Sequence, residues 1–173
     1  MNLHDKAQRI RALVLDIDGV LTDGRITYVG GGEEVKSFHV RDGHGLKLAK
    51  RAGLRVGALS GRSCEANRRR AAELEFDFLH EGKKDKRAAF AELLAEQGLA
   101  AEECLAIGDD VVDIPVLRAA GIGVAVADAP AELDAACDFR TALPGGQGAV
   151  REAVEWLLKE TGRWPELMQR YLS

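Results

Sequence analysis

The stretch VLDIDGVLTDG, residues 14–24, begins as a hydrophobic strand and turns abruptly to acid and glycine. Asp16 and Asp18 stand two residues apart where the apolar run ends. Along the rest of the chain, short apolar runs alternate with amphipathic segments, a pattern typical of a parallel sheet covered by helices on both faces. Ligands of such folds bind beyond the carboxyl ends of the strands. The stretch therefore predicts an α/β fold with a polar site at the tip of its first strand.

Length and composition indicate one globular domain over residues 1–173, because 46% of the residues are hydrophobic. The net charge of −4, from 24 basic and 28 acidic residues, gives no argument for a nucleic-acid partner. No apolar stretch reaches the roughly 20 residues of a membrane span, and the N-terminus lacks the apolar centre of a signal peptide. The three cysteines form no CxxC pair. We expect a cytoplasmic protein with no membrane partner.

The expected elements follow from hydrophobic periodicity and from glycine positions. Strands are predicted at 10–16, 55–60, 76–79, 104–108 and 122–127, and helices around 46–53 and at 63–74, 85–97, 111–120 and 149–160. Residues 25–40 are predicted to form a β-hairpin insertion that turns at Gly30-Gly31-Gly32. Residues 145–148, Gly-Gly-Gln-Gly, are expected to be the most flexible stretch and a linker to a mobile C-terminal segment. Residues 162–173 are expected to form a C-terminal tail.

Four polar clusters follow four of the predicted strands. They are Asp16-Ile17-Asp18-Gly19, Ser60-Gly61-Arg62, Asp85-Lys86, and Gly108-Asp109-Asp110 with Asp113. Each alone has an ordinary structural explanation as a helix cap, a turn or a solvent-facing charge. A parallel sheet gathers all four at one edge, where crowded carboxylates favour a bound cation. Oxygen ligands suit Mg²⁺, which commonly shares its coordination with a phosphate.

These four clusters, in this order and at strand ends, resemble the four motifs of the haloacid dehalogenase (HAD) superfamily of phosphotransferases. The resemblance implies a Rossmann-like doubly wound parallel sheet. It also implies that Asp16 is a nucleophile forming an aspartyl-phosphate, and that Asp18 is the general acid and base. The presence of an aspartate two residues after the nucleophile favours phosphatases and mutases within the superfamily.

The same resemblance assigns the binding roles. It implies Mg²⁺ held by Asp16, Asp109 and the backbone carbonyl of Asp18. It implies phosphate bound by Ser60, Gly61 and Lys86, with Asp110 and Asp113 orienting the site or completing the metal shell through water.

The segments between the motifs are too short for a cap domain, so the chain is similar to capless members of the superfamily. It resembles the 3-deoxy-D-manno-octulosonate 8-phosphate (KDO 8-phosphate) phosphatases through DIDGVLTDG, the hairpin, VRDGHG at 40–45, SGR, DK, GDD and GGQGAVRE at 145–152. Such enzymes act in lipopolysaccharide precursor synthesis and are homotetramers whose hairpins pack together. The substrate, a sugar acid phosphate, carries a carboxylate that arginine pairs with well. The substrate-binding candidates are His39, Arg41, Asp42, Gly43, Lys47, Arg62 and Arg70, with Arg62 and Arg70 expected on roughly the same face of one helix.

Other readings remain open. Phosphatases of nine-carbon, sialic-type sugar acid 9-phosphates are similar, but they have an acidic residue in place of Arg62 and lack the RDG segment. Gln147 is a difference from the KDO 8-phosphate phosphatases, because members of that family often have a basic residue at this position. A receiver-type phosphoacceptor signalling module also combines aspartates, lysine and Mg²⁺, yet it has its acidic pair first and its phosphorylated aspartate after a later strand. We therefore expect a KDO 8-phosphate phosphatase activity.

Overall fold

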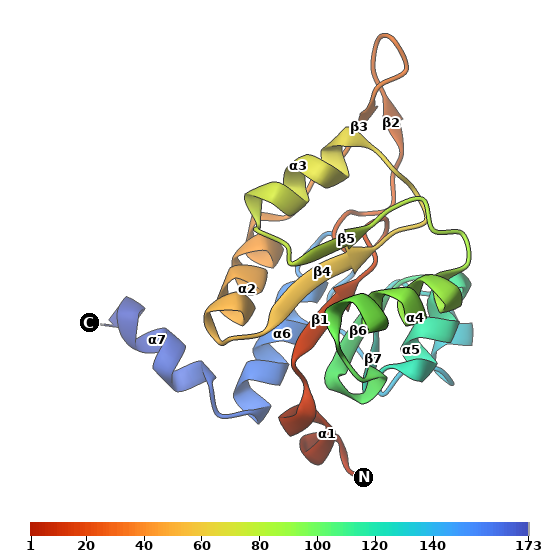
Figure 1. Ribbon diagram of the computed structural model, residues 1–173. Coiled ribbons are helices and arrows are strands. Elements are labelled where there is room, and N and C mark those ends of the chain that lie inside the picture. The colour runs from red at the N-terminus through yellow and green to blue at the C-terminus, as the bar shows by residue number, and fades with distance from the viewer. Residues whose placement is uncertain (173) are drawn as a thin grey trace.

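A six-stranded parallel sheet forms the centre of the structure, a computed structural model that describes residues 1–172 (Figure 1). The strand order is β5-β4-β1-β6-β7-β8. The strands are β1 (Ala12–Leu15), β4 (Arg55–Leu59), β5 (Phe78–His80), β6 (Cys104–Gly108), β7 (Ile122–Ala125) and β8 (Phe139–Arg140). All four residues of β1 are buried, because strands flank it on both sides and helices cover both faces. The stretch that opens with this strand therefore lies at the middle of the fold, as predicted.

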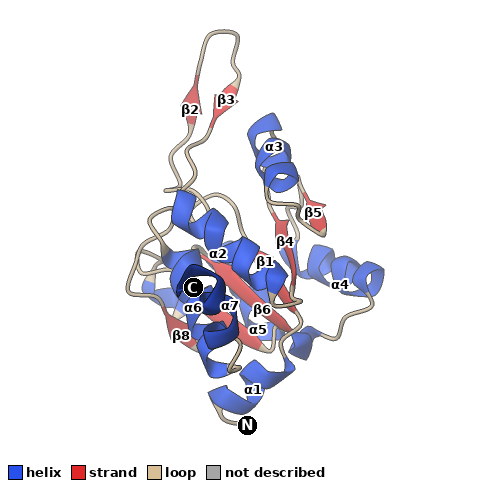
Figure 2. Cartoon of the chain, turned by 90° about the vertical axis from the view of Figure 1, so that its left-hand side faces the viewer, coloured by secondary structure: helices blue, strands red, loops and turns tan. Residues whose placement is uncertain are grey.

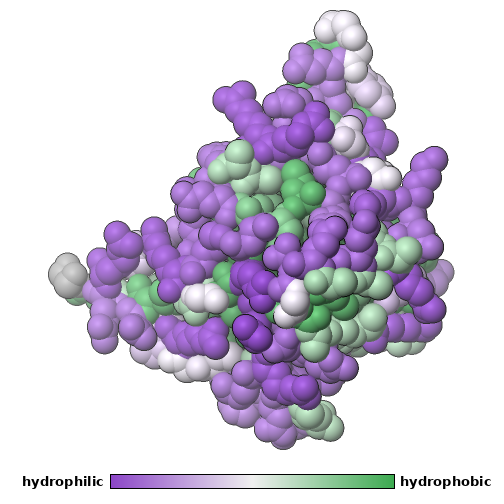
Figure 3. Space-filling view, in the orientation of Figure 1, coloured by the Kyte–Doolittle hydropathy of each residue, from purple (hydrophilic) through white to green (hydrophobic). Residues whose placement is uncertain are grey.

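Helices lie on both faces of the sheet, which confirms the doubly wound α/β class (Figure 2). They are α1 (Leu3–Arg9), α2 (Val40–Arg51), α3 (Glu65–Glu73), α4 (Lys86–Gln97), α5 (Ile114–Ala119), α6 (Ala149–Glu160) and α7 (Trp164–Leu172). Leu13 and Leu15 of β1 belong to a core cluster with residues of α2 and α6, whereas Ala12 and Val14 belong to a second cluster with residues of α4 and α5. This division follows from the alternation of side chains along a strand. The view in Figure 3 shows a largely hydrophilic surface with an apolar patch over α4 and α5, around Phe90 and Leu94.

A short antiparallel pair, β2 (Thr27–Tyr28) and β3 (Glu34–Val35), projects away from the sheet within residues 25–40 (Figures 1 and 2). Only Thr27 with Val35 and Tyr28 with Glu34 are in register. That this pair is an insertion relative to other members of the fold stays a prediction. Among residues 1–172, no helix has both the length and the hydrophobicity that crossing a bilayer would require.

Several boundaries differ from the prediction. Helix α2 begins at Val40 and includes the whole VRDGHG segment. Gly43 and Gly45 weaken the helical signal in the sequence, but each lets another part of the chain approach. A Cβ added to Gly43 would lie 2.3 Å from Nη2 of Arg70, and one added to Gly45 would lie 3.0 Å from Cδ of Arg151. Helices α1 and α7 and strand β8 were not predicted.

The prediction of a flexible linker at residues 145–148 is wrong. The N–H of Gly146 donates to the carbonyl of Val20 at 2.9 Å, and the N–H of Gly145 donates to Asp128 at 3.0 Å. A Cβ added to Gly145 would lie 1.7 Å from the carbonyl oxygen of Gly19. The glycines are therefore needed for close contact between this loop and the loop that follows β1.

Candidate active site

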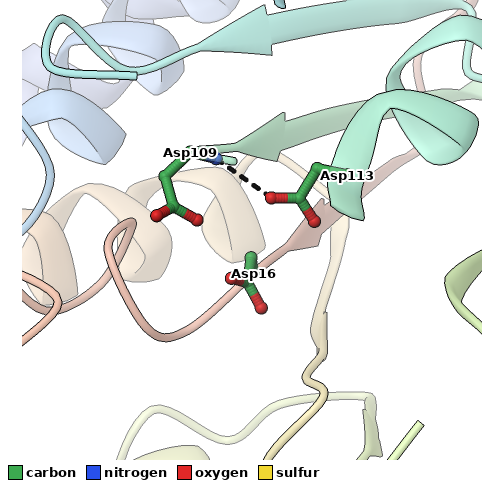
Figure 4. Close-up of side chains that lie close together, drawn as sticks. All are labelled: Asp16, Asp109 and Asp113. Atoms are coloured by element: carbon green, nitrogen blue, oxygen red, sulfur yellow. Dashed lines mark hydrogen bonds between the residues drawn. The ribbon is translucent and has the colours of Figure 1, made fainter. Parts of the chain in front are cut away.

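Three carboxylates converge at the carboxyl ends of the two central strands (Figure 4). Asp16 follows β1, Asp109 follows β6, and these strands are neighbours in the sheet. Asp113 lies in the 3-10 turn Val111–Asp113 that leads into α5. One oxygen from each of the three carboxylates lies within 4.8 Å of the others. The predicted gathering of the first and fourth polar clusters is therefore present in the structure.

A buried lysine completes this cluster. Asp85 caps α4 by accepting the N–H of Ala88 at 3.0 Å, so Lys86 is the first residue of the helix. Its Nζ lies 2.9 Å from Asp16 and 2.5 Å from Asp113, and its side chain is 5% exposed. Burial opposes the charge, but the attraction of Asp16 and Asp113 outweighs it and raises the pKa of Lys86. Lys86 is therefore a fixed positive charge beside the carboxylates.

The electrostatics of the cluster favour a cation. Burial, followed by repulsion from Asp113, raises the pKa of Asp16 to about 6. Burial, followed by repulsion from Asp16 and Asp113, raises the pKa of Asp109 to about 8. One lysine cannot balance three carboxylates when all are ionised, and the repulsion among them contributes to both raised pKa values. Oxygen donors with excess negative charge fit Mg²⁺, and Asp16 and Asp109 are the side chains that the sequence predicts as its ligands.

Asp113 contacts both the loop that carries Asp109 and the ammonium of Lys86, contacts that fit the orienting role implied by the resemblance. One of its oxygens accepts the N–H of Asp109 at 3.0 Å (Figure 4). The other accepts a hydrogen bond from Nζ of Lys86. Asp113 thus fixes both the loop that carries Asp109 and the lysine. Asp110 instead accepts the N–H of Val111 at 2.7 Å as a cap of the 3-10 turn, in agreement with a positioning role.

The loop after β1 brings Asp18 and Gly19 to the same edge. Gly19 has a φ of +90°, and a Cβ at this position would lie 2.0 Å from Oδ2 of Asp109. Any larger residue would therefore displace a predicted metal ligand. The carboxylate of Asp18 accepts a hydrogen bond at 2.5 Å from Nζ of Lys36, which follows β3. Burial opposes the charge of Lys36 too, but the hydrogen bond and charge of Asp18 raise its pKa.

The predicted phosphate-binding loop lies at the end of β4, which is adjacent to β1 in the sheet. Ser60 is 1% exposed, and its Oγ accepts the N–H of Arg62 at 3.2 Å. Its own N–H donates to the carbonyl of His80. Gly61 is open on the side where a side chain would be, and a Cβ added there would lie 3.8 Å from the carbonyl oxygen of Lys83, its nearest neighbour among residues 1–172 apart from the adjacent residues. Both residues keep their predicted phosphate-binding role as a proposal.

The predicted substrate-binding arginines already have acidic partners. Nη2 of Arg62 lies 2.7 Å from Glu34, and Nη1 of Arg70 lies 2.8 Å from Glu73. The expectation that the two arginines share a helix face is wrong, because α3 begins only at Glu65. Nε of each arginine is buried without a hydrogen-bond partner in the described residues.

The remaining candidates lie around α2. Asp42 is 1% exposed and accepts the N–H groups of Gly148 at 3.2 Å and Arg151 at 2.8 Å. Asp42 therefore accepts hydrogen bonds at the start of α6 and from the glycine loop, and its predicted substrate contact stays a prediction. His39 and Arg41 line a cavity of about 690 Å³ between α2 and α6. Gly43 packs against Arg70, and Lys47 is exposed.

Lys36 and Glu34 are the site residues that sequence reasoning missed. Both lie at the base of the hairpin, which was predicted as a structural element only. Glu34 and Lys36 are two residues apart in an extended segment, so their side chains point to the same side. This spacing was the only feature of the sequence that could have indicated their contact.

Comparison with known proteins agrees with this geometry. Residues 77–150 match the family model of the haloacid dehalogenase-like hydrolases. The chain is 42% identical over 161 residues to the 3-deoxy-D-manno-octulosonate 8-phosphate phosphatase of Haemophilus influenzae, covering 93% of this chain and 89% of that relative. The chain belongs to this family of HAD-like phosphatases.

Solved structures of the family superpose closely. The Moraxella catarrhalis enzyme, crystallised with magnesium ion, phosphate ion and KDO, matches with a TM-score of 0.94 at 36% identity, covering 97% of both chains. The cobalt-bound enzyme of Haemophilus influenzae matches with a TM-score of 0.87 at 43% identity, covering 91% of this chain and 92% of that one. These similarities confirm the predicted superfamily and its capless α/β architecture.

Proposed function

We propose that this protein is a Mg²⁺-dependent phosphomonoesterase that hydrolyses KDO 8-phosphate to KDO and phosphate. One observation carries the proposal. Four side chains, those of Asp16, Asp109, Asp113 and Lys86, converge in a chain that is 42% identical to the 3-deoxy-D-manno-octulosonate 8-phosphate phosphatase of Haemophilus influenzae. When bound by Asp16, Asp109 and the backbone carbonyl of Asp18, Mg²⁺ supplies positive charge that neutralises the phosphoryl oxygens.

The residues of the chain account for the two steps. An oxygen of Asp16 forms a bond to phosphorus while the bond between phosphorus and the sugar oxygen breaks. In its protonated form, Asp18 gives its proton to the leaving sugar oxygen. The resulting carboxylate then takes a proton from water, whose oxygen bonds to phosphorus as the bond between phosphorus and Asp16 breaks and phosphate leaves. Lys86 stabilises the charge on the transferring group and keeps Asp16 in place. Ser60 and Gly61 are suited to bind the remaining phosphoryl oxygens.

The test is phosphate release from KDO 8-phosphate in the presence of Mg²⁺. The wild-type protein is expected to release phosphate, and Asp16→Asn is expected to abolish release because the amide cannot attack phosphorus. Asp5→Asn, an exposed change in α1, serves as the matched control and keeps full activity. A wild type that leaves KDO 8-phosphate intact but cleaves a nine-carbon sugar acid 9-phosphate would contradict the substrate assignment while retaining the phosphatase activity.

We further propose a cytoplasmic homotetramer that acts in lipopolysaccharide precursor synthesis. Exposed apolar side chains on the projecting hairpin, Ile26, Tyr28 and Val35, support contact between copies, because they are 48%, 64% and 43% exposed. Light scattering is expected to give four times the chain mass of 18.7 kDa. A monomer in solution would contradict the tetramer.

A further inference from the structure

The ammonium of Lys36 lies at the junction between the hairpin and the candidate active site. Its Nζ contacts Oδ1 of Asp18 at 2.5 Å and Oε1 of Glu34 at 3.4 Å. The side chain of Lys36 is 1% exposed, although the hairpin that precedes it projects into solvent (Figure 2). A lysine is almost never fully buried unless it is paired.

Stability alone gives a weak reason for this pair, in which the Lys36 side chain is buried and the Asp18 side chain is 20% exposed. Desolvating an ammonium and a carboxylate costs free energy that their attraction often only balances, and an apolar residue of similar size can serve a fold equally well. An ion pair of this kind is useful where one of its two side chains, here that of Asp18, must be held in a single position. In the described residues, Lys36 provides the one hydrogen bond to the carboxylate of Asp18.

Lys36 is itself held from the other side. Glu34 contacts Lys36 with one oxygen and Arg62 with the other, the latter at 2.7 Å. The chain of contacts therefore runs from Asp18 through Lys36 and Glu34 to Arg62, just after β4. It fixes the base of the hairpin to two loops of the site.

We infer that Lys36 is a positioning residue that holds Asp18 in place for proton transfer to the leaving group. This inference rests on the proposed function, in which Asp18 protonates the sugar oxygen as the bond from phosphorus to that oxygen breaks. Small displacements of a reacting group reduce rates strongly, so a carboxyl group free to change rotamer transfers its proton less efficiently. The hairpin of the same chain is thereby part of the active site.

The leaving group provides the decisive measurement. A sugar alkoxide needs a proton as it departs, whereas 4-nitrophenolate departs readily without one. For Lys36→Met, we expect kcat/KM for KDO 8-phosphate to fall about 10- to 100-fold, because losing the position of the acid costs less than losing the whole contribution of general acid catalysis, which is about 100- to 10,000-fold. We expect kcat/KM for 4-nitrophenyl phosphate to change less than about threefold. Lys36→Arg, which keeps a charged donor, is expected to restore most of the loss.

Lys50→Met is the matched control, because Lys50 pairs with Asp77 at 2.8 Å outside the site. It is expected to leave both substrates unaffected. Thermal unfolding of each variant checks that the fold is retained. If Lys36→Met does not fold, the comparison is made with Lys36→Gln.

A second measurement tests whether Lys36 acts through Asp18. In a protein that already carries Asp18→Asn, Lys36→Met is expected to cause little further loss of activity. Additive losses in the double variant, or an equal fall on the alkyl and aryl substrates, would overturn the inference. Failure of the wild type on KDO 8-phosphate would contradict the proposed substrate instead, and any other alkyl phosphate that it cleaves would then be used for the comparison.

Discussion

Nζ of Lys86 lies 2.9 Å from a carboxylate oxygen of Asp16, and both side chains are less than a tenth exposed. The lysine opens α4 and the aspartate ends β1, so the contact joins two elements separated by much of the chain. Asp113 shares the same ammonium. A single positive charge therefore keeps two buried carboxylates compatible with the folded state.

Replacing this lysine is expected to cost stability as well as activity. Lys86→Met leaves Asp16 and Asp113 facing each other, and removing one partner of a buried ion pair costs about 3–5 kcal/mol. We expect a large fall in melting temperature without metal and partial recovery with Mg²⁺, because the cation replaces part of the lost charge. Phosphate release is expected to be lost in both conditions.

Lys83→Met is the control for this experiment. Lys83 pairs with Glu92 at 2.6 Å, but both side chains are a third or more exposed. Exposed pairs contribute at most about 1 kcal/mol. An equally large destabilisation by both variants would argue against a special role for the buried lysine.

The stabilisation by Mg²⁺ is expected to depend on pH. The pKa values of Asp16, about 6, and Asp109, about 8, lie above the value of 3.8 for an ordinary aspartate. Between about pH 4 and pH 8, roughly from the ordinary aspartate pKa to that of Asp109, the metal-free folded state binds more protons than the unfolded chain. The free energy of unfolding of the metal-free protein therefore falls as the pH rises through this range. Protons compete with Mg²⁺ for the same oxygens. Differential scanning fluorimetry is therefore expected to show a larger Mg²⁺-induced shift near pH 8 than near pH 5.

Asp109→Asn tests the origin of this pH dependence. The variant removes one predicted ligand and one titrating group, so both the Mg²⁺-induced shift and its growth with pH are expected to shrink. A wild-type shift of equal size at both pH values would show that these carboxylates do not bind the ion.

The sequence predicted the centre of the fold better than its surroundings. The strand before Asp16 and the helix that begins at Lys86 have strong local signals, namely an apolar run and an acidic cap with a terminal glycine. The positions of Asp16 and Asp109 at one sheet edge then follow from parallel topology. The comparisons confirm the family that the chain resembles. The roles that this resemblance implies for Asp16 and Asp109 stay proposals.

The contacts that the sequence did not predict depend on tertiary packing. Glycine has low helix propensity, so the presence of Gly43 and Gly45 led to a predicted start of α2 at about residue 46, whereas the helix begins at Val40. The pairing of Arg62 with Glu34 joins segments 28 residues apart and has no local signature. The residues 145–148 have a composition typical of linkers, yet their glycines serve close contact with the loop after β1.

That contact predicts the effect of Gly145→Ala. The added methyl group would meet the carbonyl of Gly19, so the loop after β1 must shift, and with it Asp18. We expect reduced kcat and a lower melting temperature. Gly30→Ala is the control, because no atom of the described part of the chain beyond its adjacent residues lies within 4 Å of its Cβ position, and it is expected to leave both quantities unchanged. Full activity of Gly145→Ala would show that the loop after β1 tolerates the displacement.

Asn67 predicts a stabilising substitution. It lies in α3 and is 1% exposed, and both polar atoms of its side chain lack a hydrogen-bond partner in the described residues. An unsatisfied buried polar group costs about 1–3 kcal/mol, and an apolar residue of similar size removes this cost. Asn67→Leu is therefore expected to raise the melting temperature by about 2–4 °C for each kcal/mol gained. Asn67→Asp, which buries a carboxylate at the same position, is expected to lower it. The two variants have opposite expected signs, so a fall with both would indicate that Asn67 makes a necessary polar contact, such as one to bound water.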